Sequence, residues 1–226
     1  STCTVMKKTT KYTNAYTAVV TLISNNSKNY AATLNNTTDS TIKGKIDTWY
    51  QTNILNKSDE KGQSYASYLA DSIFCGDRSL NTGSGYLLSP TSTYGAYNRV
   101  YQNRKPSLSC KQEADSYTVS SDTGNGKLTY LVGLLTIDEA SMAGGLYNSV
   151  NTQYYLYTGQ TYWTMSPSYF ISTHAVASAW SVASSGSLTT PWVSNSYGVR
   201  PVVNLSADVL ISGGDGSASN PYVVVR

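Results

Sequence analysis

Hydrophobic spacing in the first quarter of the chain predicts a strand, a loop and a helix. Residues 17–24, TAVVTLIS, are apolar and β-branched, which favours a β-strand. Residues 25–40 are rich in Asn, Thr and Ser and predict a loop. A helix is predicted over residues 41–56, capped by Asp39 or Ser40. Its apolar side chains recur with helical spacing at Ile42, Ile46, Trp49, Tyr50 and Leu55. Its exposed face would carry Lys43, Asp47 and Gln51.

The middle of the chain carries less periodicity. A short helix or turn is predicted over residues 65–73, and it leads into Phe74-Cys75. Residues 76–128 show no regular period, so we predict a long irregular region of the kind that often faces a ligand. The apolar run 130–135, YLVGLL, predicts a strand.

A short helix is expected directly after that run. Thr136 is suited to cap it, and Asp138 and Glu139 would place negative charge at the positive end of the helix dipole. Gly144 or Gly145 can end the helix in a left-handed conformation.

Strand signals are clearest towards the carboxyl end. A hairpin is predicted around Thr158-Gly159-Gln160, and a strand within SAWSVASSGSL leads to a turn at Gly186. Further strands are predicted in GVRPVVNL (198–205) and ADVLI (207–211). The pair Asp215-Gly216 favours a tight turn, so SASNPYVVV (217–225) is expected to return antiparallel to ADVLI.

Charged side chains are scarce, and one long segment lacks them. They make up 13% of the 226 residues, about half the usual fraction of roughly 25%. Residues 140–199 hold no Asp, Glu, Lys or Arg, and His174 is their only candidate charge near neutral pH. Aromatic rings and small polar groups of this kind suit a surface that recognises another molecule. They suit ionic catalysis and phosphate binding poorly, and a net charge of +3 gives no argument for nucleic acid.

The three cysteines give information on the redox environment of the protein. Cys75 and Cys110 can form a disulfide that closes a loop of about 35 residues, which implies an oxidising, extracellular setting; two buried thiols are the alternative. Cys3 is left without a partner. With no CxxC spacing and a single His, no zinc site is expected. The start STCTVMKKTT does not resemble a native start, so we expect that an export or anchoring segment preceded it.

Several motifs together resemble a known family. They are IDTWYQTNI (46–54), FCGDRS (74–79), PSLSC (106–110), TYLVGLLTIDEASMAGG (129–145), TYWTMSP (161–167), GVRPVVNL (198–205) and GGDGSASNPYVV (213–224). This combination is similar to an uncharacterised family of secreted or surface-anchored proteins of gut Firmicutes-type bacteria. The resemblance implies a C-type-lectin fold of the formylglycine-generating-enzyme-like branch, which is α+β with short antiparallel strands, two helices and extensive loops. We expect one domain over residues 1–226, with residues 1–40 as its N-terminal part.

The same branch includes the variable proteins of diversity-generating retroelements, in which a C-terminal segment is mutated at adenines. The segment between TYWTMSP and GVRPVVNL resembles such a product, so residues 161–200 are a candidate variable recognition region. The resemblance implies fixed scaffold positions at Ala179, Trp180, Val182, Gly186 and Leu188. It implies display and ligand-binding positions at Tyr169, Thr173, His174, Ser178, Ser181, Ser184, Thr189, Trp192, Ser194, Asn195 and Tyr197.

Metal and oxidase chemistry find little support in the residues. A Ca²⁺-dependent lectin site needs clustered carboxylate and amide oxygens, and the lectin motifs EPN, QPD and WND are absent. The nearest oxygen-rich stretch, residues 208–220, predicts a hairpin turn. No Cys follows Cys110, so the oxidase activity known for the fold is not expected here. We therefore predict no metal and no cofactor.

Hydrolytic chemistry is equally poorly supported. A Ser/His/Asp hydrolase would have to use His174, and the chain lacks the Gly-x-Ser-x-Gly elbow. A glycosidase needs two carboxylates facing one cleft. The pair Asp138/Glu139 is explained by a helix start, and Glu113/Asp115 by a solvated loop. We predict no catalytic residues.

Arg200 is the sole cation between Lys127 and Arg226. Within GVRPVV it is expected to be a structural anchor, with Asp138 or Glu139 as the candidate partner. A clamp for a ligand carboxylate is the functional alternative.

Three hypotheses of function follow. The first is a non-enzymatic, extracellular, cell-surface domain that binds an unknown protein or glycan on another cell or host surface, with Trp192, Tyr197, Tyr169 and His174 as anchors. The second is a structural pilus or surface-fibre subunit, and the third a cryptic hydrolase. No nucleic acid partner is expected, and a membrane is expected only through the missing N-terminal anchor.

Overall fold

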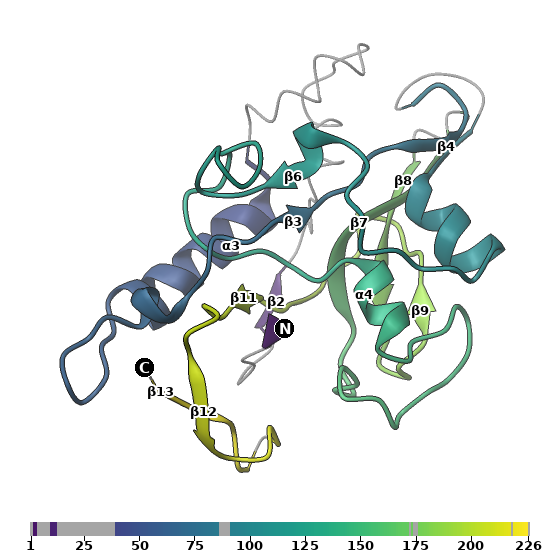
Figure 1. Cartoon of the computed structure of the whole chain (residues 1–226). Coiled ribbons are helices and arrows are strands. Elements are labelled where there is room, and N and C mark those ends of the chain that lie inside the picture. Colours follow the sequence, from purple (N-terminus) through teal and green to yellow (C-terminus); the bar gives the residue numbers. More distant parts are fainter. Residues whose placement is uncertain are drawn as a thin grey trace.

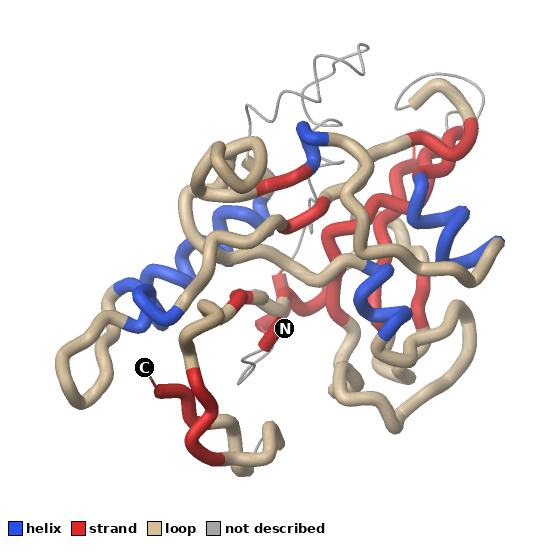
Figure 2. The backbone as a smooth tube through the Cα atoms, in the orientation of Figure 1, coloured by secondary structure: helices blue, strands red, loops and turns tan. Residues whose placement is uncertain are grey.

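The computed structural model describes residues 2–3, 10–12, 39–85, 91–171, 173, 176–217 and 219–225. Helices and mostly antiparallel strands are mixed along this part of the chain, so the fold class is α+β (Figure 1). Long loops join the elements, as the tan segments of Figure 2 show. The predicted strand 17–24 and most of the predicted loop 25–40 lie outside the described residues.

A seven-stranded sheet forms the centre of the fold. Its strands are β2 Thr10–Tyr12, β4 Leu80–Thr82, β5 Ser92–Tyr94, β7 Tyr162–Ile171, β8 Val176–Val182, β9 Leu188–Thr189 and β10 Tyr197–Val199. The longest strand, β7, pairs along one edge with β8, and its other edge is shared by β10 near Tyr162 and β5 near Phe170. β2 extends the sheet beyond β10, β4 beyond β5, and β9 beyond β8. Only the pairing of β10 with β7 is parallel among these described strands.

Both faces of this sheet are covered by apolar clusters. On one face, helix α3 (Thr41–Tyr50) contributes Ile42 and Ile46 to a cluster with Trp163 of β7. On the other face, helix α4 (Ile137–Met142) contributes Ile137 to a cluster with Trp180 of β8. Because neither face is open here, residues 177–182 of β8 are all buried, and their mixture of Ala, Ser, Trp and Val shows no solvent side.

The predicted helix over residues 41–56 is confirmed. α3 begins after Ser40, whose hydroxyl oxygen accepts a hydrogen bond from the Lys43 backbone N–H at 3.1 Å. The wide helical turn η1 (Gln51–Leu55) continues it. Lys43 forms an ion pair with Asp47 one turn later, so these two charges are half-buried on the flank of the helix rather than free in solvent.

The predicted cap at Thr136 is also confirmed. The Thr136 hydroxyl accepts from the Glu139 N–H at 3.1 Å, and the Glu139 carboxylate accepts from the Thr136 N–H at 2.7 Å, which completes a capping box. Gly144 follows the helix with φ +118°, the conformation expected of its terminator.

Three two-stranded sheets complete the described fold. They are β1 Thr2–Cys3 with β11 Val203–Asn204, β3 Phe74–Cys75 with β6 Ser116–Tyr117, and β12 Leu210–Gly213 with β13 Val223–Val225. The last pair confirms the predicted antiparallel return through the Asp215-Gly216 turn. This yellow hairpin lies at the margin of the molecule in Figure 1.

Three predictions for the middle of the chain are wrong. Residues 130–135 form no strand, because their single bridge joins Gly133 to Val202 and their apolar side chains divide between the two clusters. Gly159 occupies a turn at φ +67°, but the residues before it form no strand, so there is no hairpin. The region 76–128 contains regular elements that its sequence did not indicate: β4, β5, β6 and the helical segments η3 (Tyr97–Gln102) and η4 (Glu113–Asp115). The turn expected near 65–73 is present as η2 (Tyr65–Tyr68).

Candidate functional site

The candidate recognition region, residues 161–200, is built on a rigid frame. It comprises β10, β7, β8 and β9, which lie side by side in that order in the central sheet. The expected scaffold positions Ala179, Trp180, Val182, Gly186 and Leu188 are all buried. Gly186 has φ +79°, and a Cβ added there would overlap the Asn151 carbonyl oxygen. Only glycine fits this turn, so it fixes the return from β8 to β9.

One row of side chains crosses five neighbouring backbone segments on the same face of the sheet. Thr82 lies opposite Thr93, Thr93 opposite Tyr169, Tyr169 opposite Ser178, and Ser178 opposite Trp192. Directly opposed residues of antiparallel segments project to one face. We call these five residues the cross-strand row. None of them carries charge, and their side chains are hydroxyl groups and aromatic rings alone.

Trp192 stands at the open end of this row with 54% of its surface exposed. Its neighbour Val193 is buried in the α3-side cluster, and the Val193 N–H donates to the Ala177 carbonyl at 3.1 Å. The Trp192 carbonyl accepts from both the backbone N–H and the side-chain amide of Asn195, each at 3.0 Å. The backbone on both sides is therefore anchored while the indole faces outward.

Tyr169 is half-buried in the same row. Its ring lies 6.3 Å from that of Tyr97 in an edge-to-face arrangement, and its hydroxyl donates to the Thr190 carbonyl at 3.5 Å. Tyr97 also contacts Tyr101, with ring centroids 5.1 Å apart, and Tyr101 lies 4.5 Å from Tyr147. We call Tyr97, Tyr101, Tyr147 and Tyr169 the tyrosine cluster. Burial, and secondarily the neighbouring phenols, raises the pKa of Tyr97, so the Tyr97 side chain is a neutral group at physiological pH.

The remaining expected display positions differ in their placement. Thr173, Ser184, Ser194 and Asn195 are exposed, and Thr189 is half-buried. Ser184 lies in the turn after β8 and Thr173 near the turn before it, so strand length alone separates them by roughly 20 Å. His174 lies outside the described residues.

Ser178, Ser181 and Tyr197 require correction. Ser178 is fully buried and its hydroxyl donates to the Thr190 or Pro191 carbonyl, at 2.6 and 2.7 Å. Ser181 is fully buried against Thr189 at 2.8 Å, so neither serine is displayed. Tyr197 packs on Trp163 with ring centroids 4.9 Å apart. It therefore belongs to the α3 side of the sheet, not to the face that carries Tyr169 and Trp192.

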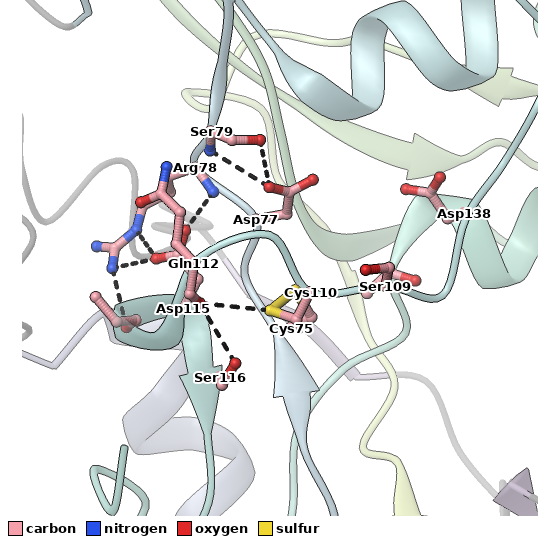
Figure 3. Close-up of a disulfide and its surroundings, with 12 residues drawn as sticks. Cys75, Asp77, Arg78, Ser79, Ser109, Cys110, Gln112, Asp115, Ser116 and Asp138 are labelled. Carbon is pink, nitrogen blue, oxygen red and sulfur yellow. Dashed lines mark hydrogen bonds and ion pairs between the residues drawn. A yellow bond between two sulfur atoms is a disulfide. The ribbon is translucent and has the colours of Figure 1, made fainter. Parts of the chain in front are cut away.

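A disulfide and a buried ion pair lie close together near β3 and η4, as Figure 3 shows. Cys75 is bonded to Cys110, which confirms the predicted pairing. Arg78 donates to the Asp115 carboxylate from Nε at 2.6 Å and from its backbone N–H at 2.6 Å. Asp115 is fully buried, so its expected place in a solvated loop is wrong.

Arg99 joins the disulfide region to α4. Its guanidinium donates to both Asp138 carboxylate oxygens at 2.7 and 2.8 Å and lies 2.6 Å from the Asp77 carboxylate. These contacts outweigh desolvation and raise the pKa of Arg99, which stays charged. The Asp138 side chain is thus committed to structure.

Arg200 has different neighbours from those predicted. Its guanidinium lies 4.6 Å from the centre of the Tyr162 ring, and it donates to the Leu156 carbonyl at 3.3 Å. Neither Asp138, held by Arg99, nor Glu139, held by Thr136, is its partner. Burial lowers the pKa of Arg200, against the opposing effect of Tyr162. The predicted acidic partner is therefore wrong.

The described residues do not assemble a cluster that could hold a metal ion. No group of three or more His, Cys, Asp or Glu side chains converges among them. A cavity of about 110 Å³ lies beside the start of α3, between Ile42, Phe74, Leu128 and Leu134. Its lining is mainly apolar and includes one carboxylate, that of Asp39.

The tyrosine cluster shows what sequence reasoning missed. Tyr97, Tyr101 and Tyr147 all lie outside residues 161–200, yet they pack on the face that carries Tyr169. The available signal was the pair of tyrosines four residues apart in AYNRVYQN, which is typical of one helix face.

No helix within the described ranges has the length and apolar character that crossing a membrane requires. No protein-family model, curated protein or solved structure matches the chain.

Proposed function

We propose that this protein is a non-enzymatic binding domain that acts outside the cell, and that the end of the sheet marked by Trp192 is its recognition surface. The observation that carries the proposal is the outward, backbone-anchored indole of Trp192 in an uncharged row with Tyr169. Large aromatic side chains held rigidly at a surface commonly provide most of the energy of binding. The disulfide favours an oxidising compartment.

The fold proposed for this domain is the C-type-lectin type, in the branch that includes retroelement-diversified variable proteins. Support comes from the resemblance of its motifs and from the mixed, mostly antiparallel architecture. Within residues 161–200, buried scaffold residues alternate with exposed turns. Such a frame tolerates changes at the turns without loss of the core, which is what a diversified surface needs.

The binding proposal is tested with Trp192→Ala on glycan and protein arrays. We expect the variant to lose at least about tenfold in affinity for at least one protein or glycan that the native protein binds, while stability stays within about 0.5 kcal/mol because the side chain is exposed. Tyr222→Ala, an aromatic of similar exposure on the β12–β13 hairpin, is the matched control and should bind normally. Equal binding by native protein and Trp192→Ala would overturn the assignment of this surface.

The diversification proposal is tested by resequencing the locus across strains. Substitutions are expected to concentrate between Pro167 and Gly198, at exposed positions such as Ser194 and Asn195, and to spare the buried Ser178 and Ser181. An even spread of substitutions along the chain would contradict it.

One observation favours the second candidate, a surface-fibre subunit. The β12–β13 hairpin exposes apolar side chains without a third strand among the described residues, and these are Leu210, Ile211, Tyr222, Val223 and Val225. Under this function, sedimentation would show concentration-dependent assembly that Leu210→Ser with Val223→Ser abolishes. A monomer at all concentrations leaves the binding-domain proposal preferred.

A further inference from the structure

The segment η3 carries two adjacent rows of side chains, an aromatic stripe of Tyr97 and Tyr101 and an amide stripe of Asn98 and Gln102. Tyr97 and Tyr101 are four residues apart, and Asn98 and Gln102 repeat the interval one position later. Residues at this spacing are neighbours on a helical surface. The two rings are in edge contact at 5.1 Å, and the Asn98 amide N–H donates to the Gln102 carbonyl oxygen at 3.1 Å. Tyr101 exposes 41% of its surface.

Side-chain hydrogen bonds tie the amide stripe to the sheet. The Asn81 amide N–H donates to Thr93 Oγ1 at 3.0 Å and to Gln102 Oε1 at 3.4 Å. The Asn103 amide N–H donates to Asn98 Oδ1 at 2.6 Å. These contacts join β4, β5 and η3, so the amide planes are oriented before any ligand arrives. Such preorganisation reduces the entropy lost on binding.

Two polar atoms of this network remain unused within the described part of the chain. Asn81 Oδ1 accepts no hydrogen bond from these residues and Gln102 Nε2 donates none. In contrast, Asn81 Nδ2 donates hydrogen bonds and Gln102 Oε1 accepts them. A side-chain amide offers one acceptor oxygen and two donor hydrogens. The surface therefore presents a free acceptor on Asn81 and a free donor on Gln102, the residue that follows the exposed Tyr101 in η3.

The groups at this surface are uncharged. Arg99 belongs to the same segment, but its guanidinium turns inward to Asp77 and Asp138. The nearest charges further along the chain are the exposed Arg104 and Lys105, which follow η3. Neither is part of the amide network.

We propose that η3 and β4 form a subsite for a neutral saccharide. A pyranose ring has an apolar C–H face and a fringe of hydroxyl groups, each of which donates and accepts. The Tyr101 ring stacks on the C–H face, Asn81 Oδ1 accepts from one hydroxyl, and Gln102 Nε2 donates to its neighbour. The subsite lies outside residues 161–200, and it stands whether or not Trp192 binds a ligand.

The test titrates the intact protein with neutral hexasaccharides of β-1,4-linked glucose, xylose and mannose, and with an acidic oligogalacturonate, by calorimetry and saturation-transfer NMR. We expect at least one neutral oligosaccharide to bind. Tyr101→Ala should weaken that binding about tenfold, as the loss of one aromatic contact implies. Tyr65→Ala, which removes a ring of the same 41% exposure on η2, should leave it unchanged.

Gln102→Glu gives a second, isosteric variant that does not depend on Tyr101. It keeps the oxygen that accepts from Asn81 and Asn98 but removes the Nε2 donor, so neutral-sugar affinity should again fall about tenfold while folding is retained. Trp192→Ala should change the saccharide affinity less than twofold, which separates this subsite from the proposed recognition surface.

Four outcomes would overturn the proposal. They are the absence of binding to every neutral hexasaccharide, stronger binding to the oligogalacturonate, binding that survives both substitutions, and a protein ligand found on an array whose binding depends on Tyr101.

Discussion

At the scale of single residues, the space around the backbone, rather than charge, restricts which residue type fits within residues 161–200. Gly186 is the clearest case, because its φ of +79° disfavours any L side chain and an added Cβ would overlap the Asn151 carbonyl oxygen. The backbone on both sides is held in the β8–β9 pairing, so it has little freedom to move away.

Gly186→Ala should therefore destabilise the protein by more than about 2 kcal/mol, measured by urea denaturation. Gly44→Ala is the control, since nothing lies within 4 Å of a Cβ at Gly44. It should raise stability by up to about 1 kcal/mol, because alanine is the better residue inside a helix. A Gly186→Ala protein as stable as the native one would contradict the close approach.

Buried tyrosine side chains limit the stability of the protein at alkaline pH. Burial disfavours the phenolate and raises the pKa of Tyr162 to about 12, against the opposing effect of Arg200. The unfolded chain loses this proton near pH 10 while the folded chain keeps it. The contribution to stability is thus complete below pH 10 and is lost as the pH rises from 10 towards 12.

The free energy of unfolding should fall above pH 10, with Tyr162 responsible for up to about 1.4 kcal/mol per pH unit. Urea titrations between pH 8 and 11.5 measure this slope, and Tyr162→Phe should make it shallower. If both proteins show the same slope, Tyr162 does not titrate as its burial implies.

At the scale of elements, a disulfide and ion pairs supplement the short strand pairings of the region 76–128. The Cys75–Cys110 disulfide closes this segment and stabilises it by about 3–4 kcal/mol on the chain-entropy estimate. Arg99 then joins η3 to α4 through Asp138 and to the disulfide loop through Asp77. Removing this cation would leave two buried carboxylates facing each other.

Arg99→Met should accordingly reduce the free energy of unfolding by about 3–5 kcal/mol, because it leaves the buried carboxylates without a positive partner. Lys105→Met removes an exposed cation nearby and should change stability by less than about 0.5 kcal/mol. Thermal and urea unfolding of the two variants provide the comparison. Similar losses in both would show that the ion pairs contribute little.

At the scale of the whole molecule, the central sheet separates two apolar clusters, and the C-terminal hairpin stands apart from both. No residue of β12 or β13 belongs to either cluster. A two-stranded hairpin is marginally stable by itself in water. The fold therefore combines a firmly packed centre with a weakly held terminal element.

Hydrogen exchange should resolve this difference. Backbone amides of Leu210–Gly213 and Val223–Val225 are expected to exchange far faster than those that join β7 to β8, because local opening exposes them without disturbing the core. Protection of the hairpin equal to that of β7–β8 would instead indicate a stabilising contact that the isolated hairpin lacks.

Much of the fold was predictable where the signal is local. The helix from Thr41, its cap at Ser40, the capping box at Thr136 and the turn at Gly186 each depend on residues a few positions apart. The short strands and irregular turns of residues 76–128 were not predictable, because their elements are fixed by pairing with distant strands, by a disulfide and by ion pairs between distant residues.

The candidate site divides in the same way. The sequence by itself determined that residues 140–199 are uncharged and rich in rings and hydroxyls, and that Trp192 is a candidate anchor. Only the tertiary structure decided that Trp192 and Tyr169 share one face, that Tyr197 belongs to the other, and that Ser178 and Ser181 are buried. The physical reason is that both faces of β8 are covered. The alternation of side chains along β8 therefore does not indicate which face meets solvent.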